Sequence, residues 1–349
     1  MDWTLSGITH EWQYQLVDSA TLTARGWLDG VKGGKLTEAY RGETRSQLAL
    51  DLDGSEIPLG SAVRVWHVAT YGEETVRECM GTFHPEPAGG KYEYGRMTSS
   101  VTLYSSLMKL KTTKGKQVRS VGKVNVINHF KEIVPWALAV PYVAPSWQTG
   151  KNFADGYVWQ MPSESIYAEA QRCADAIGGY LGVDVMGKVT LTPYKKPSSL
   201  PESFWLLPGT VVHFGVDVDV PELVNRIVAK HEKDGKTYTS VANLDASHPW
   251  SKESIGRIVA EELTNVTIQD GSSIQTQLDK ATKQALEERK AAKRTFTVQS
   301  NYDSAARCGA AGHLTYNDIT ETINAKVFCS GREIQLDHTA DMSLTLEEL

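Results

Sequence analysis

Two pairs of side chains in this sequence have residue types and a spacing that suit chemistry. Cys308 and His313 are near each other in the chain, and a cysteine beside a histidine base is a pairing used in nucleophilic catalysis. Asp217 and Asp219 alternate on a strand-like stretch, so both carboxylates face one side and offer oxygen ligands to calcium. Neither pair has the further groups that its chemistry needs, because no third residue orients His313 and no other oxygen ligands accompany the aspartates.

Motifs of the common enzyme and metal classes are missing from the chain. The nine histidines never form His-Glu-x-x-His, and the Gly-x-Ser-x-Gly elbow, the Walker loop and the dinucleotide fingerprint are absent. The carboxylate pair of a glycosidase cannot be sought in sequence, because its separation is spatial. The cysteines lie far apart with no Cys-x-x-Cys pair, which favours buried free thiols over zinc ligands: Cys79, Cys173, Cys308 and Cys329. We therefore expect no enzyme activity, no catalytic residue, no cofactor and no metal site.

Aromatic residues gather between residues 135 and 159, where Trp136, Trp147 and Trp159 are accompanied by proline, tyrosine and glycine. Tryptophan rings stack on sugars, and they also anchor protein interfaces. A carbohydrate-binding β-protein is therefore the alternative function that this segment keeps open.

A basic run occupies residues 109–123, which contain no acid. Its members are Lys109, Lys111, Lys114, Lys116, Arg119 and Lys123. Clustered lysine and arginine can bind phosphates by releasing counterions, but no aromatic residue interleaves this run. A solvated loop or a contact with an acidic neighbouring chain is the favoured interpretation. The run contributes +6 to a net charge of −6, so the rest of the chain carries −12 and has no global attraction for nucleic acid.

Length and hydrophobic periodicity predict three domains in these 349 residues. Residues 1–108 are expected to form a β-domain, because strand-like segments 14–17, 45–52, 62–68 and 98–103 alternate polar and apolar residues. Residues 109–200 are expected to form a mixed α/β insert with helices at 125–134 and 163–177 and a hairpin at 180–194. The Lys/Pro/Ser-rich linker 195–201 precedes a second β-domain, 201–349, with strands at 295–299, 322–329 and 342–346.

The second β-domain is expected to contain one long helix opening near Ser272. Ser272 and Gln275 form a capping-box pattern, in which the Gln275 side chain reaches back to the helix start. Small and apolar residues recur at helical spacing behind it: Ile274, Leu278, Ala281, Ala285 and Ala292. This alanine-rich face is predicted to lie against a sheet or a neighbouring chain. The chain has no apolar run of membrane-spanning length, and its acidic start is unlike a signal peptide, so we expect cytoplasmic synthesis and no membrane segment.

The order of features around this helix resembles that of hub proteins in bacteriophage tail tips and baseplates, which are related to the hub part of contractile injection and type VI spike proteins. A strand bearing Asn225-Arg226 is followed by an Asp234-Gly235 hairpin, an Asn-x-Asp-x-x-x-Pro-x-Ser loop at 243–251 and an Ile-Gly-Arg segment at 255–257. The helix-then-hairpin unit ending at 187–191 and the turn at 53–60 are similar to parts of the same family.

The resemblance implies an α+β, mainly β chain with two tube-like antiparallel barrel or sandwich domains flanking the insert. It implies a structural homotrimer whose six β-domains form a pseudo-hexameric ring at the tail tip of a virion, synthesised in the bacterial host. Expected partners are a distal tail protein ring, a tape-measure protein, and a spike, fibre or receptor-binding protein. DNA would pass through the lumen without specific binding.

Overall fold

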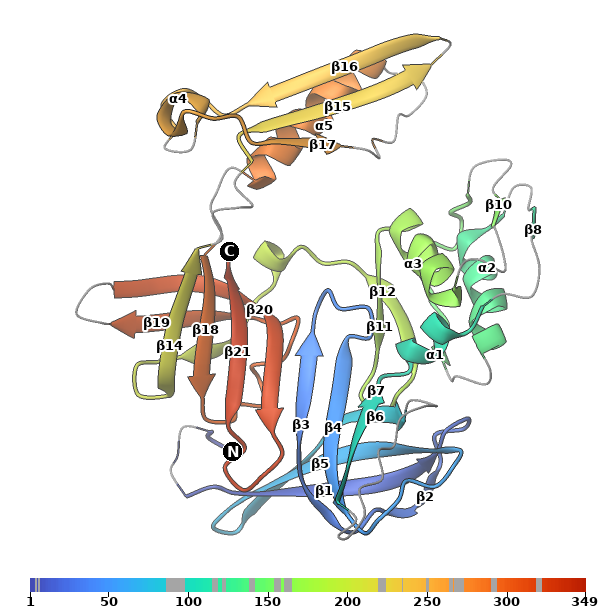
Figure 1. Ribbon diagram of the computed structural model, residues 1–349, viewed down its shortest axis with the longest axis vertical. Helices are drawn as coiled ribbons and strands as arrows, with labels where there is room; N and C mark the ends of the chain where they lie inside the picture. The colour runs from blue at the N-terminus through green and yellow to red at the C-terminus, as the bar shows by residue number, and fades with distance from the viewer. Residues whose placement is uncertain are drawn as a thin grey trace. The chain divides into compact units, whose positions relative to one another are not determined.

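One open sheet organises most of the chain, and it is built from segments whose side chains alternate between two environments (Figure 1). The computed structural model describes the chain except residues 4, 6, 86–97, 115–118, 121–123, 138–141, 154–157, 160–164, 219–223, 234, 249–250, 264–265, 267–272, 290–293 and 318–321. Within the described residues the architecture is α+β and mainly β, as predicted.

The described part of this sheet has 13 strands in the order β14-β18-β21-β20-β3-β4-β7-β6-β5-β1-β2, with β19 beside β20 and β13 beside β19. The strands are β1 (Thr9–Asp18), β2 (Ala24–Trp27), β3 (Val31–Ala39), β4 (Ser46–Asp53), β5 (Ser61–Tyr71), β6 (Glu74–Pro85), β7 (Thr98–Tyr104), β13 (Glu202–Leu206), β14 (Val211–Val218), β18 (Arg294–Ser300), β19 (Ala311–Asn317), β20 (Thr322–Gln335) and β21 (Met342–Glu348).

Alternation explains why these segments become strands. In β4 the buried residues Leu48, Leu50 and Leu52 are separated by more accessible ones, which is the period of two that a half-buried strand requires. The strands predicted in both β-regions are confirmed. The sheet also joins the two ends of the chain, since Arg332 of β20 stands directly opposite Glu38 of β3 in antiparallel register.

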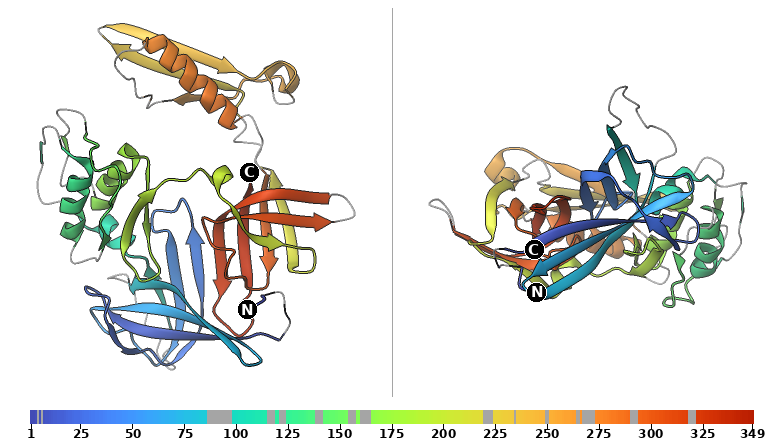
Figure 2. Two further views of the ribbon diagram at one scale, coloured as in Figure 1. Left: turned by 180° about the vertical axis from the view of Figure 1, so that it is seen from behind. Right: turned by 90° about the horizontal axis from the view of Figure 1, so that it is seen from below.

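Helices and a hairpin between β7 and β13 form the insert (Figure 2). It contains α1 (Leu107–Thr112), β8 (Arg119–Ser120), α2 (Val126–Ile133), the 3-10 turn η1 (Val134–Ala137), β9 (Tyr142–Val143), β10 (Val158–Trp159), α3 (Ile166–Ala176), β11 (Gly179–Val183), β12 (Val189–Pro193) and η2 (Pro197–Ser199). Both predicted helices and the hairpin are confirmed. Asn125 caps α2 and Ser165 caps α3, each accepting a backbone N–H, whereas the predicted cap Ser163 lies outside the described residues.

A smaller body follows β14, in which α5 (Ile274–Arg289) packs on β15 (Arg226–Lys233) and β16 (Lys236–Asn243). β17 (Ala260–Leu263) runs parallel to β15, and α4 (Lys252–Ile255) precedes it. The predicted hairpin is confirmed, because Lys233 pairs with Lys236 across a two-residue turn whose Gly235 has a φ of +72°.

The helix of this body decides between two surroundings predicted for its alanine-rich face. Ser272 lies outside the described residues, and so does the predicted capping pair. The Gln275 amide N–H donates to Thr239 O of β16 and to Asp279 Oδ1, both at 2.9 Å. The alanine-rich face was predicted to lie against a sheet or a neighbouring chain, and in the structure α5 packs against the sheet of β15 and β16. The buried side chains of α5 are Leu278, Thr282, Ala285 and Leu286, while Ala281 is half-buried.

The chain divides into two compact units. Unit 1 comprises Met1–Phe214, Thr297–Glu347 and Leu349, and unit 2 comprises Gly215–Phe296 with Glu348. The three-domain division with boundaries after residues 108 and 200 stays a prediction. Among the helices described, none is long and apolar enough to cross a membrane.

Candidate functional site

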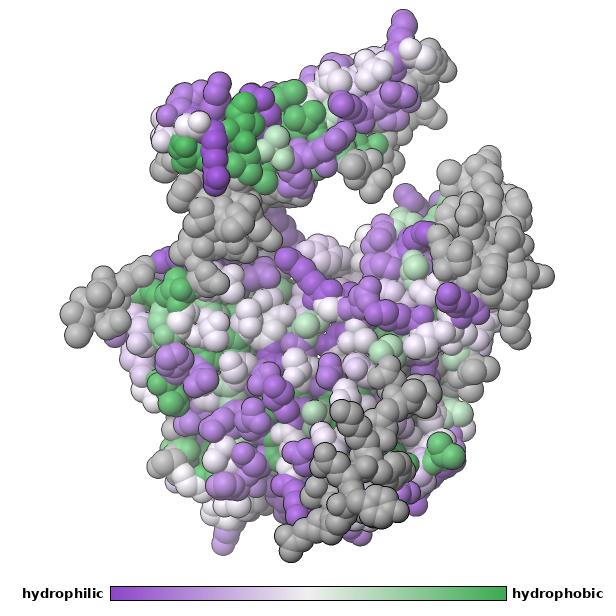
Figure 3. All heavy atoms as spheres, viewed as in Figure 1, coloured by the Kyte–Doolittle hydropathy of each residue, from purple (hydrophilic) through white to green (hydrophobic). Residues whose placement is uncertain are grey.

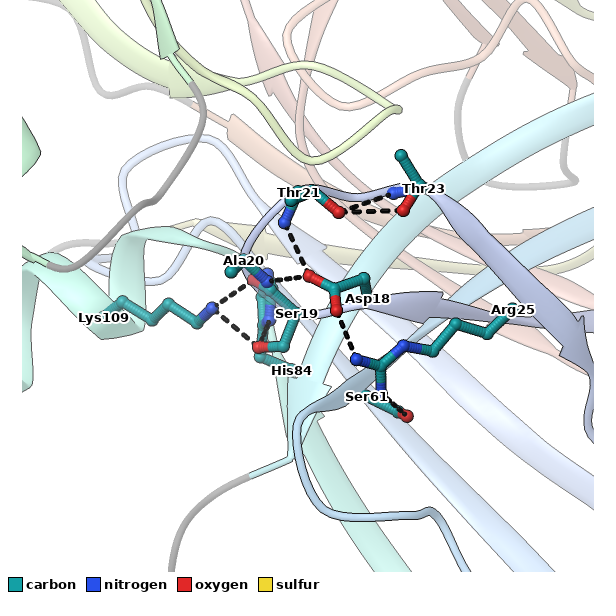
Figure 4. A network of polar contacts seen from close by, with 9 residues as sticks. All are labelled: Asp18, Ser19, Ala20, Thr21, Thr23, Arg25, Ser61, His84 and Lys109. Atoms are coloured by element: carbon teal, nitrogen blue, oxygen red, sulfur yellow. Dashed lines mark hydrogen bonds and ion pairs between the residues drawn. The ribbon is translucent and has the colours of Figure 1, made fainter.

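A chain of polar side chains lies where the turn between β1 and β2 meets α1 (Figure 4). Asp18 organises the turn, because its Oδ1 accepts the backbone N–H groups of Ala20 and Thr21 at 2.9 and 2.8 Å. These backbone hydrogen bonds lower the pKa of Asp18 to about 2. Asp18 also forms an ion pair with Arg25, whose Nη1 donates to Ser61 Oγ at 3.2 Å.

Lys109 of α1 extends this network inward. Its Nζ donates to the carbonyl oxygen and the hydroxyl of Ser19 at 2.7 and 2.8 Å, and burial lowers the pKa of Lys109 to about 8. Ser19 Oγ lies 3.2 Å from His84 Nδ1, His84 Nε2 lies 3.0 Å from Ser106 Oγ, and Ser106 Oγ donates to Gly187 O at 2.6 Å. Burial lowers the pKa of His84 to about 3.

These contacts have one consistent direction of donation. The Ser106 hydroxyl donates its only proton to Gly187 O, so Ser106 Oγ accepts from His84 Nε2–H. His84 Nδ1 then carries no proton and accepts from the Ser19 hydroxyl. Ser19 therefore donates to His84 and accepts from Lys109. The relay assigns the Nε2–H tautomer to a neutral His84.

A serine beside a lysine with a lowered pKa is also a pair found in nucleophilic enzymes. Here the serine proton is directed to His84 and not to Lys109. The neighbouring amides of Ala20 and Thr21, which would have to stabilise an oxyanion, already donate to Asp18. The network consequently ties the β1–β2 turn, α1 and the β11–β12 turn together.

The β11–β12 turn is fixed to the sheet by a second set of contacts. Arg64, 5% exposed, donates to Thr82 Oγ1 and Leu22 O at 3.1 Å, and to Met186 O at 3.4 Å. Thr82 Oγ1 in turn donates to Val185 O at 3.1 Å. Gly187 is required there, since its φ is +90° and a Cβ would lie 2.9 Å from Thr82 Cβ. The insert is thus anchored on β5 and β6 by side chains of the sheet itself.

The contacts of the predicted pair Cys308 and His313 lead in different directions. Cys308 Sγ donates to Ser330 O at 3.4 Å, and burial raises the pKa of this thiol, which opposes a nucleophilic thiolate. His313 Nε2 lies 2.5 Å from Asn324 Oδ1, and its Nδ1 lies 3.6 Å from Glu202 Oε1. The carboxylates of Asp217 and Asp219 lie outside the described residues.

The tryptophans of the insert are part of its packing where they are described. Trp136 and Trp147 are half-buried against the apolar cluster of α2 and α3, and Trp147 Nε1 donates to Leu191 O at 3.4 Å. A carbohydrate platform needs an exposed ring face, so these two residues do not support the alternative function. The side chain of Trp159 lies outside the described residues.

The basic run is partly engaged inside its own unit. Lys109 is bound to Ser19 as described, and Lys111 forms an ion pair with Glu43. Lys114 is exposed, while Lys116, Lys123 and the side chain of Arg119 lie outside the described residues. The absence of an acid within the run did not reveal these partners, because Ser19 and Glu43 belong to the first β-region.

One buried cluster was not predicted from the sequence. His129 of α2 and Glu169 and Cys173 of α3 are 1%, 0% and 0% exposed, and their ligand atoms all lie within 4.8 Å of one another. His129 Nε2 lies 2.7 Å from Glu169 Oε1, and Arg172 Nη1 donates to Glu169 Oε2 at 3.0 Å. The available signal was that Glu169 and Cys173 are one turn apart on the apolar side of a predicted helix.

Both units also expose apolar side chains. Trp205, Leu207 and Val212, on or beside β13 and β14, are 54%, 47% and 74% exposed. In unit 2, Val241 of β16 and Ile258 are 53% and 43% exposed, and Figure 3 shows hydrophobic side chains gathered on the face of unit 2 that it presents.

Comparison with known proteins places the fold. No family model matches the sequence, and no curated protein matches it. The tail protein from Neisseria meningitidis MC58 is similar in structure, with a TM-score of 0.66 at 13% identity over 97% of each chain. The prophage MuSo2 43 kDa tail protein from Shewanella oneidensis gives 0.63 at 11% identity, covering 97% of this chain and 96% of that chain. A chain of the Francisella PdpA-VgrG complex gives 0.58 at 8% identity, covering 99% of this chain and 58% of its own length. The predicted likeness to tail hub proteins is confirmed for the fold.

Proposed function

We propose that this chain is a structural hub protein of a phage tail tip or baseplate. The observation that carries the proposal is the fold, which is shared over 97% of both chains with the tail protein from Neisseria meningitidis. The anchored insert supports it, because a ring component that transmits load needs its parts fixed to one another. The Ser19–Lys109 pair, directed toward packing, supports a structural and non-catalytic role.

Assembly is proposed to give a homotrimer that forms a pseudo-hexameric ring in the virion. The sheet is open in the described residues, with β14 and β2 at its two ends. Open edges carry unpaired backbone N–H and C=O groups that pair readily with another chain. On the edge strand β14, Val212 is 74% exposed, which adds an apolar contact to such pairing.

The partners in this proposal are the distal tail ring, the tape-measure protein and a spike, fibre or receptor-binding protein. DNA passes through the lumen without being held, so the wall is proposed to be acidic or neutral and the basic run to face a neighbouring chain. Lysines lining a lumen would retain phosphates through counterion release. Lys109 and Lys111 already bind Ser19 and Glu43 of their own unit, which supports a lumen that does not hold phosphates.

Native mass measurement of the full chain, combined with single-particle images, tests the proposal. We expect a trimer with a central opening at concentrations up to those of tail assembly. Monomer and dimer alone across that range would overturn the trimeric hub. A glycan array on the same sample tests the alternative, and specific glycan binding by a monomer would favour the carbohydrate-binding function.

A further inference from the structure

The insert contains three metal-ligating side chains in the middle of an apolar core. His129 comes from α2, and Glu169 and Cys173 come from successive turns of α3. Their surroundings are buried hydrophobic residues of the insert, including Phe130 and Ala170, which are both 0% exposed. Ionisable groups are rarely placed in such a core unless something compensates for their desolvation.

Two of the three ligand-type side chains are in direct contact with each other. His129 and Glu169 share a 2.7 Å contact, and Arg172, with its side chain 42% exposed, holds the other carboxylate oxygen at 3.0 Å. The Cys173 sulfur lies in the same group, with its ligand atom within 4.8 Å of the other two. An imidazole nitrogen, a carboxylate oxygen and a sulfur therefore lie close together.

We propose that His129, Glu169 and Cys173 form a buried site for one divalent transition-metal ion of the zinc class. Thiolate, imidazole and carboxylate are the three side-chain ligand types that zinc takes in proteins, with bond lengths of about 2.0–2.3 Å. Three ligand atoms within 4.8 Å of one another can close on such an ion through small side-chain movements. The fourth tetrahedral position is left to a solvent molecule.

Charge and protons balance at this site. A dication with one thiolate, one carboxylate and one neutral imidazole is neutral overall, which suits an apolar core. Binding releases the Cys173 S–H proton to solvent, and the imidazole of His129 carries its proton on Nδ1 so that Nε2 can coordinate. Arg172 stays on Glu169 Oε2 and orients the carboxylate, as outer partners of metal ligands do.

The ion would act as a structural clamp between α2 and α3. These helices pack together and carry half of the buried residues in the apolar cluster of the insert. A metal that joins ligands from both helices binds the folded insert and not the unfolded chain, so it adds stability by linkage. This role is independent of the proposed function in the tail.

Metal analysis of the untagged full chain, purified without chelators, tests the site. We expect about one zinc-class ion per chain, lost on Cys173→Ala or His129→Gln. Cys329→Ala is the matched control, because Cys329 is also 0% exposed but lies on β20, outside the cluster. This control is expected to retain the ion.

Cobalt substitution keeps the test decisive if a variant fails to fold. Wild-type chain stripped of metal and given Co²⁺ is expected to develop thiolate-to-cobalt charge-transfer absorption, and its thermal midpoint is expected to rise. A wild-type chain that holds no stoichiometric metal, shows no thiolate band with Co²⁺ and unfolds at the same temperature with or without a chelator would overturn the proposal. The three residues would then be a hydrogen-bonded core triad.

Discussion

Unit 1 and unit 2 stabilise their layers in different ways. In unit 1 several strands of the large sheet carry buried ionisable residues, and four of these residues are at most 5% exposed to solvent: Arg64, His67, His84 and Arg332. The apolar cluster described in unit 2 is small and consists of Val224, Ile227, Ala242, Leu244, Ala285 and Leu286. Beside it lies a short polar chain in which Ser240 Oγ donates to Asp279 Oδ1 at 2.6 Å.

The buried groups of unit 1 fix strand register as well as adding stability. Arg332 and Glu38 are direct cross-strand neighbours, and the Nε and Nη2 atoms of Arg332 both reach Glu38 Oε2 at 2.6 Å. Removing one partner of such a buried pair typically costs roughly 3–5 kcal/mol, because the other charge is left uncompensated. A register slip between β20 and β3 would carry the same cost. In unit 2 the buried hydroxyls of Ser240 and Thr282 lie 3.0 Å apart, and this contact joins neutral groups, so breaking it leaves no uncompensated charge.

The largest expected difference between the two units is in how their stability depends on pH. Burial lowers the pKa of His67 and of His84 to about 3, whereas an unfolded histidine has a pKa near 6.5. Below pH 6.5 these histidines bind protons in the unfolded chain but stay neutral in the folded chain. The free energy of unfolding therefore falls by about 1.4 kcal/mol per pH unit for each imidazole. The lowered carboxyl pKa values of unit 2, Asp245 and Asp279, act only below about pH 4. Between pH 6.5 and 4.5 unit 1 should lose about 5 kcal/mol while unit 2 keeps its stability.

Hydrogen exchange read peptide by peptide at several pH values measures this difference. His67 lies in an aromatic cluster, with its ring centroid 4.5 Å from that of Trp12. His67→Phe removes one of the two titrating imidazoles and should reduce the pH dependence of unit 1 stability by about half. Val212→Ala, at an exposed position of β14, is the control that should leave the slope unchanged, because it removes no titratable group. Equal loss of protection in both units over this pH range would contradict the expected separation.

Deleting one core side chain is expected to affect the units unequally. Leu278 is 0% exposed on α5, and a buried Leu→Ala change costs roughly 2–5 kcal/mol. Because the described core of unit 2 is small, Leu278→Ala should open that unit while unit 1 stays protected. Leu50→Ala in β4 is the matched change in unit 1 and should lower the protection of the large sheet instead. If either variant lowers protection everywhere, the two units unfold together.

The strands and helices were predictable because their signals are local. The leucines of β4 alternate, Asn125 precedes an apolar helix face, and Asp234-Gly235 stands between two strand-like runs, so each pattern lies within a short window. Helix boundaries are less exact, since the observed cap of α3 is Ser165, two residues after the predicted one. Gln275 could not be predicted in the same way, because its partner Thr239 belongs to another strand.

The polar sites were not predictable because their partners are distant in sequence. Lys109 and Ser19 are 90 positions apart, and His129 and Glu169 are 40 apart. Composition placed Lys109 in a solvated or intermolecular run, whereas folding carries its ammonium group to a carbonyl and a hydroxyl of the β1–β2 turn. Residue type shows what a side chain can bind, but only the sheet topology decides which groups it meets.

The smallest expected effect distinguishes packing within unit 2 from contact between chains. Ala285 is 7% exposed against the sheet, whereas Ala281 is half-buried one turn earlier. Extra methylene groups in a packed core cost roughly 1–3 kcal/mol, so Ala285→Leu should lower the thermal midpoint of unit 2. Ala281→Leu should change the free energy of unfolding of unit 2 by only a few tenths of a kcal/mol, because a partly open site can accommodate the larger side chain. Calorimetry and native mass measurement on both variants check this contrast. An Ala281→Leu chain with an unchanged midpoint and a weakened oligomer would show that the exposed flank of α5 contacts another chain, whereas unchanged behaviour in Ala285→Leu would mean that the helix is not closely packed on β15 and β16.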